Sequence, residues 1–233
     1  MRIVMVICCL AILATVAFAE EQSALQTEKE KISYSLGVSI GKGLVNQGID
    51  IDVDLIARGL KDAVSAGQTL LTDQQMQEIL VNLQKQVMAR QQQKVAELAA
   101  DNRKKGEEFL TGNKTKEGVV ALPSGLQYRI VSPGTGPKPK ATDTVVTNYR
   151  GTFIDGREFD SSKKNGGPAT FSVNGVIKGW TEALQLMDVG AKWQLFIPPD
   201  LAYGEKGAGE VIGPNETLIF DVQLIEIKTP SPN

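Results

Sequence analysis

Residues 217–227 read TLIFDVQLIEI, and this stretch decides the fold of the C-terminal half of the chain. Apolar residues stand at every second position, at Leu218, Phe220, Val222 and Leu224. Successive side chains of a strand point to opposite faces of a sheet, so this alternation is typical of a half-buried antiparallel strand. We therefore expect a strand over residues 217–227 that forms part of an antiparallel sheet.

The sequence before this strand has the composition of further strands. Glycine, proline and β-branched residues become frequent after about residue 111, and turn residues separate the β-rich segments. The further predicted strands are Leu126–Val131, Thr144–Phe153, Ala169–Val173 and Lys192–Ile197. One helix, near Gly179–Met187, interrupts them. Antiparallel strands with a single helix indicate a compact α+β domain.

The helix of this half starts with Gly179 and Trp180, one of two tryptophans in the chain. Trp180, Ala183, Leu184 and Met187 share one helical face, so they are predicted to face the core. Because Trp180 stands at the helix start, a second interpretation is open for it alone: its indole could lie flat beneath a cleft. The second tryptophan falls inside a predicted strand, at position 193, and is interpreted as a packing residue.

The N-terminal half, from Glu28 to about Thr111, has the pattern of helices and almost no proline. Two short helices precede a long one, which begins after a capping box of Thr72 and Gln75. The apolar stripes of these helices make a poor core for a single chain, because the buried fraction of a fold falls with its size. We therefore expect an all-helical module that forms a homodimer through residues 28–87. The alternative is that these helices fold back on the C-terminal half.

The chain begins with MRIVMVICCLAILATVAFAE, which combines Arg2 with an apolar run and an Ala-Phe-Ala sequence. This is the pattern of a secretory signal peptide that is cleaved after Ala19, and an uncleaved membrane anchor is the alternative. We expect an exported protein in the periplasm, in the outer membrane or at the cell surface. The predicted organisation is a signal peptide (1–19), a helical dimerisation domain (20–71), a long connecting helix (72–114) and the α+β domain (115–233).

The composition excludes several kinds of chemistry. The chain has no histidine, so it lacks Ser-His and Cys-His nucleophilic catalysis and the commonest zinc ligand. Both cysteines, Cys8 and Cys9, lie in the predicted signal peptide. The formal net charge of −2 does not favour nucleic acid as a partner. We expect neither a metal nor another cofactor.

Three longer segments carry a resemblance to a known family. They are NYRGTFIDGREFDSS (148–162), VIKGWTEALQLMDVGAKWQLFIPPDLAYG (176–204) and IGPNETLIFDVQLIEI (212–227). In this order they are similar to the Y-x-G, DG-x-x-FDSS, V-I-x-GW, Y-G and L-x-F-D/E-V blocks of FKBP-type peptidyl-prolyl cis-trans isomerases. These blocks cover most of residues 122–228. With its helical N-terminal half, the whole chain resembles the Mip (macrophage infectivity potentiator) proteins of Gram-negative bacteria, which are homodimers. The resemblance implies an FKBP-like antiparallel β-sheet wrapped on one short helix.

The resemblance also implies a proline-binding site. Its catalytic groups would be Asp160, Tyr203 and the backbone N–H of Ile177. The N–H group and the Tyr203 hydroxyl would bind substrate carbonyl oxygens, and Asp160 would form a polar wall beside the twisted amide. Trp180 would be the floor of the pocket, with aromatic side chains as walls. The substrate-binding residues that the family pattern implies are Tyr149, Phe159, Phe171, Val176, Trp180, Ile212 and Phe220.

Simpler interpretations exist for some of these residues. Phe171 and Phe220 lie in predicted strands and would be core residues in any β domain, and Asp160 could start a turn through Asx hydrogen bonds. Two positions also depart from the family pattern: Ala169, where an aromatic residue is common, and Ala208, in a loop tip that often carries histidine. They leave open the substrate preference beside the proline and the affinity for macrolide inhibitors.

An apolar site suits the reaction that the resemblance implies. Rotation about an X-Pro bond has a barrier of about 18–20 kcal/mol, which amide resonance sets. Lowering it requires no nucleophile or metal, but a cleft that binds the twisted amide better than the planar one. The resemblance thus implies an enzyme that accelerates the folding of exported proteins and contributes to host-cell infection. The alternatives are a dimeric chaperone and a surface adhesin that binds proline-rich chains such as collagen.

Overall fold

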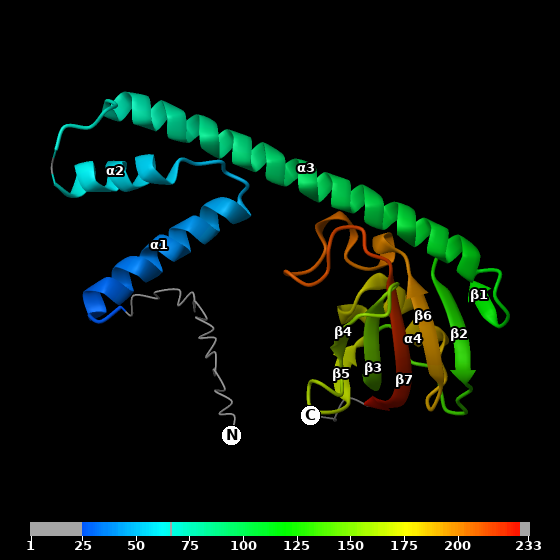
Figure 1. The fold of residues 1–233 in the computed structure, drawn as a ribbon. Helices are drawn as coiled ribbons and strands as arrows, with labels where there is room; N and C mark the ends of the chain where they lie inside the picture. The colour runs from blue at the N-terminus through cyan, green and yellow to red at the C-terminus, as the bar shows by residue number, and fades with distance from the viewer. Residues whose placement is uncertain (1–24, 66, 229–233) are drawn as a thin grey trace, which may run out of the picture. The chain divides into compact units, whose positions relative to one another are not determined.

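The computed structural model describes residues 25–65 and 67–228, so the predicted signal peptide lies outside the described residues. The chain divides into two compact units between Leu80 and Val81. The first unit is helical, and the second contains an antiparallel sheet with a helix, as the sequence predicts (Figure 1). Within the described ranges, no helix is long and apolar enough to cross a membrane.

The helical elements follow the boundaries that their capping residues set. They are α1 (Glu28–Asn46), α2 (Val53–Val64) and α3 (Asp73–Asn113). The predicted capping box of α3 is confirmed, because the N–H of Gln75 donates to Oγ1 of Thr72 and the N–H of Thr72 donates to Oε1 of Gln75. Thr27 and Glu30 form a second capping box at the start of α1. Both boxes provide acceptors for N–H groups that the first helical turn leaves unpaired.

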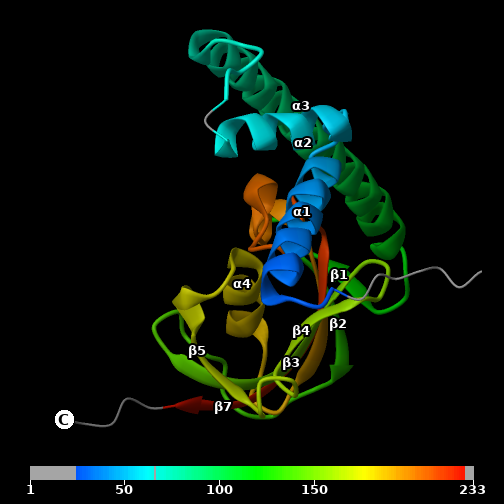
Figure 2. The same cartoon turned by 60° about the vertical axis from the view of Figure 1, so that its left-hand side comes forward.

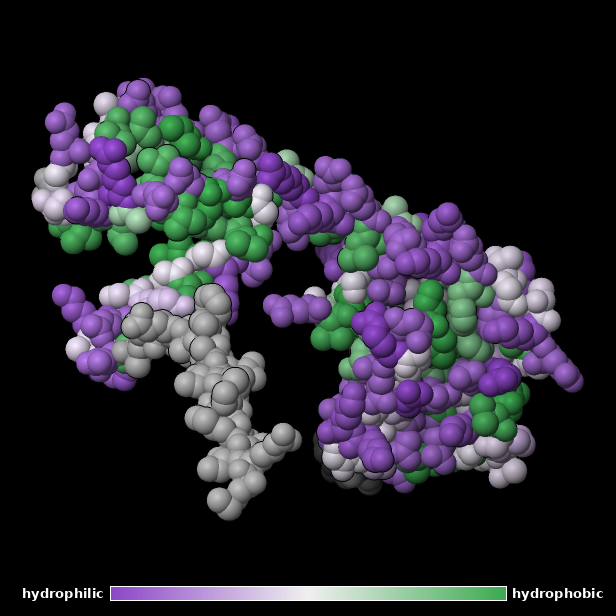
Figure 3. Space-filling model, in the orientation of Figure 1, coloured by the Kyte–Doolittle hydropathy of each residue, from purple (hydrophilic) through white to green (hydrophobic). Residues whose placement is uncertain are grey.

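The first unit leaves its apolar side chains in solvent. In the described chain, neither α1 nor α2 contains a buried residue. Leu36 is 59% exposed, Leu60 is 63% exposed and Leu80 is 62% exposed. Figure 3 shows hydrophobic side chains gathered over α2 and the start of α3. An apolar surface of this extent is typical of a surface that another molecule covers.

The second unit is built on a sheet of seven described strands, in which all paired strands are antiparallel. The strand order is β1-β2-β6-β7-β3-β4, and β5 pairs with β3. The strands are β1 (Val119–Ala121), β2 (Gln127–Ser132), β3 (Thr144–Phe153), β4 (Glu158–Ser161), β5 (Ala169–Ser172), β6 (Lys192–Ile197) and β7 (Leu218–Lys228). The five predicted strands agree with these bounds to within one residue. The sequence pattern does not predict the short strands β1 and β4.

Helix α4 (Lys178–Leu186) lies against the sheet of the second unit (Figure 2). Ala183, Leu184 and Met187 are fully buried, as the helical spacing predicts. Gly179 has no room for a side chain, because an added Cβ would lie 2.6 Å from Cγ2 of Ile197 in β6. A glycine at this position therefore lets the start of α4 approach the sheet closely.

The interpretation of Trp193 as a packing residue is confirmed. Trp193 is buried, and its ring stacks on that of Tyr128 with centroids 4.2 Å apart and an interplanar angle of 11°. The pair joins the neighbouring strands β2 and β6.

The last turns of α3 belong to the second unit and pack against its sheet. The Phe109 ring lies 6.0 Å from the Phe196 ring, measured between centroids. Nδ2 of Asn113 donates to Oε1 of Gln127 at 3.0 Å, and Asn113 is buried. The long helix is therefore exposed along most of its length, but its last turns belong to the packed structure of the second unit.

Candidate functional site

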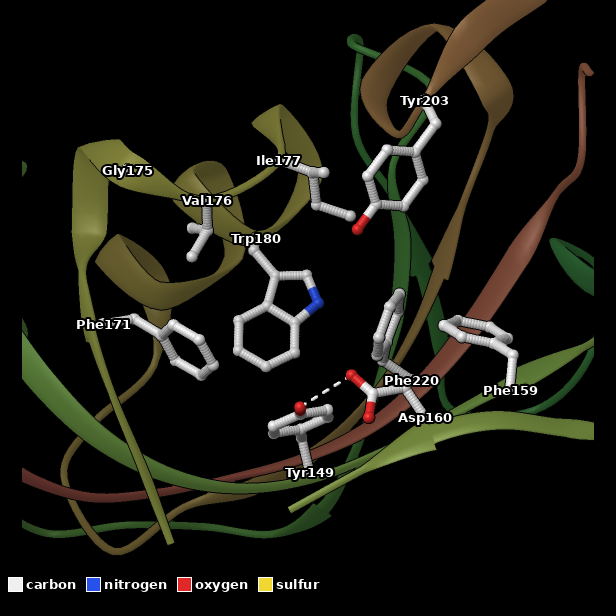
Figure 4. A pocket seen from close by; sticks show the side chains of 10 residues that line it. All are labelled: Tyr149, Phe159, Asp160, Phe171, Gly175, Val176, Ile177, Trp180, Tyr203 and Phe220. Carbon is white, nitrogen blue, oxygen red and sulfur yellow. Dashed lines mark hydrogen bonds between the residues drawn. The ribbon is translucent and has the colours of Figure 1, made fainter. Parts of the chain in front are cut away.

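A cavity of about 420 Å³ opens in the second unit (Figure 4). Residues from four strands, from α4, from the short 3₁₀ helix Val173–Gly175 and from the intervening loops surround it. The lining residues are Tyr149, Phe159, Asp160, Phe171, Gly175, Val176, Ile177, Trp180, Tyr203 and Phe220. The walls are mainly aromatic and aliphatic, and the polar atoms are few. This is the usual composition of a site that binds an apolar group in a fixed orientation.

Trp180 lies at the centre of the lining side chains and is 3% exposed. Three rings meet the indole almost at right angles. The centroid of Tyr149 lies 5.5 Å from it at 82°, that of Phe171 lies 5.7 Å away at 80°, and that of Phe220 lies 5.3 Å away at 86°. Edge-to-face pairs of this kind are favourable because the edge of a ring is positive and its face is negative. The three contacts fix the plane of the indole.

The indole nitrogen of Trp180 is buried, and among the described residues it has no hydrogen-bond partner. Figure 4 shows this nitrogen on the side of Phe220. The indole thus contributes a hydrophobic surface to the cavity.

Gly151 allows two aromatic walls of the cavity to meet. A Cβ added to Gly151 would lie 2.6 Å from Cζ of Phe159 and 2.8 Å from Cε1 of Phe220. The Phe159 and Phe220 rings are T-shaped, with centroids 5.5 Å apart and an interplanar angle of 87°. The glycine of the Y-x-G block is therefore explained by the space that these two rings occupy.

Asp160 is the charged side chain of the cavity, and two neighbours orient it. The hydroxyl of Tyr149 donates to Oδ2 of Asp160 at 2.7 Å, and Nδ2 of Asn165 donates to Oδ1 at 2.9 Å. Nδ2 of Asn165 also donates to the Tyr149 hydroxyl oxygen at 3.3 Å. These bonds, in the part of the chain that the structure describes, are not those of an Asx turn, so the simpler interpretation of Asp160 is wrong.

The Tyr149 hydroxyl keeps its proton under ordinary conditions. Burial, followed by its hydrogen bond to the Asp160 carboxylate, raises the pKa of Tyr149 to about 12. The phenol is therefore neutral at pH 7 and serves as the donor in the bond to Asp160. Asn165 completes this arrangement, although no sequence motif identifies it. Its only sequence signal is a position five residues after Asp160, in a turn rich in Lys, Asn and Gly.

Two hydrogen-bond donors lie beside the cavity. The carbonyl oxygen of Ile177 accepts bonds from the N–H groups of Trp180 and Thr181, at 2.9 and 3.0 Å, as α4 begins. The N–H of Ile177 has no acceptor among the described residues. Tyr203 is 39% exposed, and burial together with the Asp160 charge raises the pKa of its phenol. Its hydroxyl is therefore neutral at pH 7 and available to donate.

The structure places one expected lining residue elsewhere. Ile212 is buried in the hydrophobic core of the second unit and is not among the residues that line the cavity. Its backbone forms an antiparallel bridge with Ala208, with N–H···O distances of 2.8 and 3.1 Å. Gly175, in the short 3₁₀ helix Val173–Gly175, lines the cavity although the family pattern does not single it out. All the other expected site residues line the cavity.

Metal ligands are not grouped in the described part of the chain. No cluster of three or more His, Cys, Asp or Glu side chains that could hold a metal ion occurs there. The groups that the cavity offers to a ligand are ring faces, aliphatic side chains, one carboxylate and two hydrogen-bond donors.

Comparisons with known proteins agree with this site and fold. Residues 136–225 match the family model described as FKBP-type peptidyl-prolyl cis-trans isomerase. Residues 29–130 match the model of a domain amino-terminal to FKBP-type peptidyl-prolyl isomerase. The chain belongs to the FKBP-type peptidyl-prolyl cis-trans isomerase family.

Similar proteins place this isomerase among the Mip proteins, as the resemblance implies. The chain is 50% identical to "Outer membrane protein MIP" of Legionella longbeachae over 93% of each chain. It is 46% identical to "Peptidyl-prolyl cis-trans isomerase Mip" of Coxiella burnetii over 90% of this chain and 91% of that protein. The crystal structure of FkpA from Escherichia coli matches with a TM-score of 0.73 at 41% identity, over 90% of this chain and all of that one. This FKBP-type isomerase therefore shares its helical N-terminal region as well as its sheet with known relatives.

Proposed function

We propose that this isomerase acts on X-Pro bonds of exported proteins and holds the proline ring against Trp180. The observation that carries the proposal is the aromatic enclosure of Trp180 by Tyr149, Phe171 and Phe220. The cavity of about 420 Å³ lies in the size range of small-ligand sites and can take a proline with its flanking peptide groups.

The enclosure favours the twisted amide over the planar one. Resonance places partial charges on the oxygen and nitrogen of a planar amide, and water stabilises these charges more than it stabilises the twisted form. Removing water in an apolar cavity therefore lowers the barrier. Each 1.4 kcal/mol of selective stabilisation accelerates rotation about tenfold. This mechanism needs no nucleophile or proton transfer, which fits a cavity lined mainly by aromatic side chains.

The two donors beside the cavity fix the substrate backbone. We assign the Ile177 N–H and the Tyr203 hydroxyl to substrate carbonyl oxygens. The support is the Ile177 N–H, which has no acceptor in the described part of the chain, and the raised pKa of the Tyr203 phenol. A donor that holds one carbonyl while the proline ring is held in the cavity restrains both sides of the rotating bond.

Asp160 is assigned to the twisted amide itself. Its carboxylate is held by Tyr149 and Asn165 at 2.7 and 2.9 Å and faces the cavity. A fixed charge costs no reorganisation when the charges of the amide redistribute during rotation. We therefore place Asp160 with Tyr203 and Ile177 as the catalytic groups, and the aromatic and aliphatic lining as the substrate-binding groups.

Export of the protein is part of the proposal. It rests on the signal-peptide pattern of residues 1–19 and on the relative named "Outer membrane protein MIP". The site of action would be the periplasm or the outer surface. The corresponding organisation has a helical domain at 20–71, a connecting helix at 72–114 and the isomerase domain at 115–233.

We also propose that the helical unit forms a homodimer through residues 28–87. The support is the exposed apolar surface of α1, α2 and the start of α3. A second copy of the chain has matching helices and can cover this surface by symmetry.

A proline-limited refolding assay tests the roles assigned to the site. The full chain should accelerate refolding. Asp160→Leu and Tyr203→Phe should each lower kcat/KM by about tenfold or more. Tyr203→Phe should leave Tm unchanged, whereas Asp160→Leu should lower Tm modestly, because the donors of Tyr149 and Asn165 lose their acceptor. Tyr128→Phe is the matched control, because Tyr128 stacks on Trp193 outside the cavity. Wild-type rates in both site variants would remove Asp160 and Tyr203 from the mechanism.

A second candidate function is a dimeric chaperone or adhesin that holds proline-rich chains such as collagen. The exposed apolar helices favour it, since two linked sites bind one chain more tightly than either site alone. The Asp160→Leu variant separates the two functions. Binding without turnover predicts that this variant still suppresses aggregation of an unfolded client.

Two further proposals concern the same protein. One is that macrolides bind in the aromatic cavity, which competition with a proline peptide can test. The other is a contribution to host-cell infection.

A further inference from the structure

The last turns of α3 contact the loop that carries Tyr203 towards the cavity. This contact involves four residues of α3, Ala99, Asn102, Arg103 and Gly106, which we call the α3 clamp. Both partners belong to the second compact unit. The loop runs from the 3₁₀ helix Pro199–Leu201 to the start of β7.

Asn215 is the centre of the contact. It is 5% exposed and has a φ angle of 55°, in the left-handed region. Its Nδ2 donates to the carbonyl oxygen of Ala99 at 3.3 Å, and its Oδ1 accepts from a guanidinium nitrogen of Arg103 at 3.3 Å. Its backbone N–H donates to the carbonyl oxygen of Gly204 at 2.8 Å. One buried residue thus joins α3 to the position next to Tyr203.

The clamp holds the loop at further points. Nδ2 of Asn102 donates to the carbonyl oxygen of Pro214 at 2.9 Å. The Arg103 guanidinium also lies 3.6 Å from Oδ1 of Asp200. Arg103 therefore contacts residues that precede Tyr203 and residues that follow it.

Gly106 brings the helix and the loop into direct contact. Gly106 is buried in the last turns of α3. An added Cβ would overlap with Oγ1 of Thr217 and would lie 3.1 Å from Cβ of that residue. Thr217 immediately precedes β7, which carries Phe220 into the cavity. The helix and the loop are therefore in close contact at Gly106.

Between Tyr203 and Pro214 the loop is also held by the burial of Ile212 in the hydrophobic core and by its bridge to Ala208. Gly204, Gly207 and Gly209 have positive φ angles, which other residues rarely adopt. Glycines give a chain many conformations, so the ordered form of this loop requires contacts that hold it. The side-chain hydrogen bonds that join the described loop to the rest of the domain are made with α3.

We propose that the α3 clamp positions Tyr203 for substrate binding, so the end of the connecting helix is a working part of the isomerase site. The clamp residues are positioning residues, because they act through Asn215 and Gly204 and do not reach the cavity. The inference rests on the proposed role of Tyr203 as a donor to substrate.

Two variants of the full chain loosen the clamp by different means. Asn215→Gly removes both side-chain bonds and retains the positive φ angle. Gly106→Ala inserts a methyl group between α3 and Thr217. Gly112→Ala is the control, because an added Cβ at Gly112 has no heavy atom within 4 Å and this position is on the same helix.

The first measurement is amide hydrogen exchange. Peptides that cover residues 203–215 should exchange about tenfold faster in Asn215→Gly and Gly106→Ala, and peptides of β7 should not change, because only local order is lost. Gly112→Ala should exchange like the wild type. Unchanged exchange of residues 203–215 in both clamp variants would overturn the proposal, whatever their activity.

The second measurement is isomerase kinetics on a short proline peptide. Each clamp variant should raise KM and lower kcat/KM by about fivefold, with a smaller effect on kcat. In a Tyr203→Phe background the same substitutions should have less than about a twofold effect, because the group that they position is already lost. Losses that add to that of Tyr203→Phe would show that the clamp acts independently of Tyr203 and would overturn the positioning role.

One outcome concerns the proposed function and not the clamp. If Tyr203→Phe by itself has wild-type kinetics, the role assigned to the Tyr203 hydroxyl fails. Hydrogen exchange then decides by itself whether α3 orders the loop.

Another outcome concerns the clamp itself. If Tyr203→Phe lowers activity, but the clamp variants exchange faster without any change in kinetics, the positioning role is refuted.

Discussion

The hydroxyl of Tyr149 donates a 2.7 Å hydrogen bond to the carboxylate of Asp160, and the same tyrosine ring packs edge-to-face against Trp180. One residue of β3 thus joins the hydrophobic part of the cavity to its charged group. Its pKa of about 12 keeps the donor protonated at neutral pH. The orientation of Asp160 therefore depends on the aromatic packing beneath it.

The first prediction separates the two roles of Tyr149. Tyr149→Phe keeps the ring but removes the donor, so Asp160 is left with the single bond from Asn165. We expect kcat to fall several-fold and the free energy of unfolding to fall by about 1 kcal/mol, the usual net contribution of one hydrogen bond. Peptide isomerisation and urea unfolding measure the two effects. Tyr128→Phe is the control, and a Tyr149→Phe enzyme with wild-type kcat would contradict the role given to this bond.

The second prediction concerns the space at Gly151. Gly151→Ala places a methyl group 2.6–2.8 Å from atoms of the Phe159 and Phe220 rings, which cannot both move without changing the cavity. We expect a loss of about 1–3 kcal/mol in the free energy of unfolding, as for other overpacked cores, together with weaker peptide binding. Gly112→Ala should not destabilise the protein, because that site is open and alanine favours a helix. Equal stabilities of the two variants would disprove the explanation.

The third prediction uses the ion pairs of Glu158 in β4. Hydrogen bonds from Arg150, Ser161 and Lys164 lower the pKa of this carboxyl to about 2 from an ordinary value of 4.5. A lowered folded-state pKa stabilises the protein above the unfolded-state pKa. This contribution is therefore complete above about pH 4.5 and is lost as the pH falls to about 2.

Urea unfolding of Glu158→Gln between pH 2 and 7 tests this linkage. The variant should be less stable at pH 7, and its stability should fall less steeply with acid than that of the wild type. Glu210→Gln, at an exposed carboxylate without an ion pair in the described structure, should follow the wild-type curve. Parallel curves for Glu158→Gln and the wild type would show that Glu158 does not contribute.

The fourth prediction concerns the exposed helices of the first unit. If residues 28–87 form a homodimer, Leu36→Glu combined with Ile40→Glu should produce a monomer at micromolar concentration, because buried charges without partners are costly. Sedimentation measures the change. Val131→Glu, at an exposed valine of β2, should leave the association state unchanged. A wild-type chain that sediments as a monomer would exclude the dimer.

Periodicity predicts much of the fold but little of the site. The alternation in residues 217–227 predicts the central strand β7, and the spacing of Ala183, Leu184 and Met187 predicts the buried face of α4. Both follow from local geometry, in which each side chain points in a direction that the backbone period sets. The cavity residues, by contrast, come from four strands, two helices and the loops between them, and the family resemblance identifies all of them except Gly175, where periodicity does not.

Other features depend on contacts that no regular period describes. Asn165 reaches Asp160 because of the path of one turn, and Ile212 is turned into the core by a bridge to Ala208. Asn102 and Arg103 look like solvated helix residues in the sequence, although they bind the loop after Tyr203. The contacts of Asn102 and Arg103 join segments more than a hundred residues apart, so no local pattern reveals them.

The last prediction compares the two tryptophans, both of which are buried. Trp180 lines the cavity, and Trp193 stacks on Tyr128 away from it. Trp180→Leu should weaken binding of a proline peptide by at least about tenfold, because it removes the flat surface that meets the proline ring. Trp193→Leu should lower the free energy of unfolding by a few kcal/mol, roughly as other large-to-small core substitutions do, without weakening peptide binding in the folded protein. Calorimetric titration and urea unfolding of both variants measure the two quantities. If Trp193→Leu weakens binding as much as Trp180→Leu, the loss reflects general destabilisation, and Trp180 is not the floor of the site.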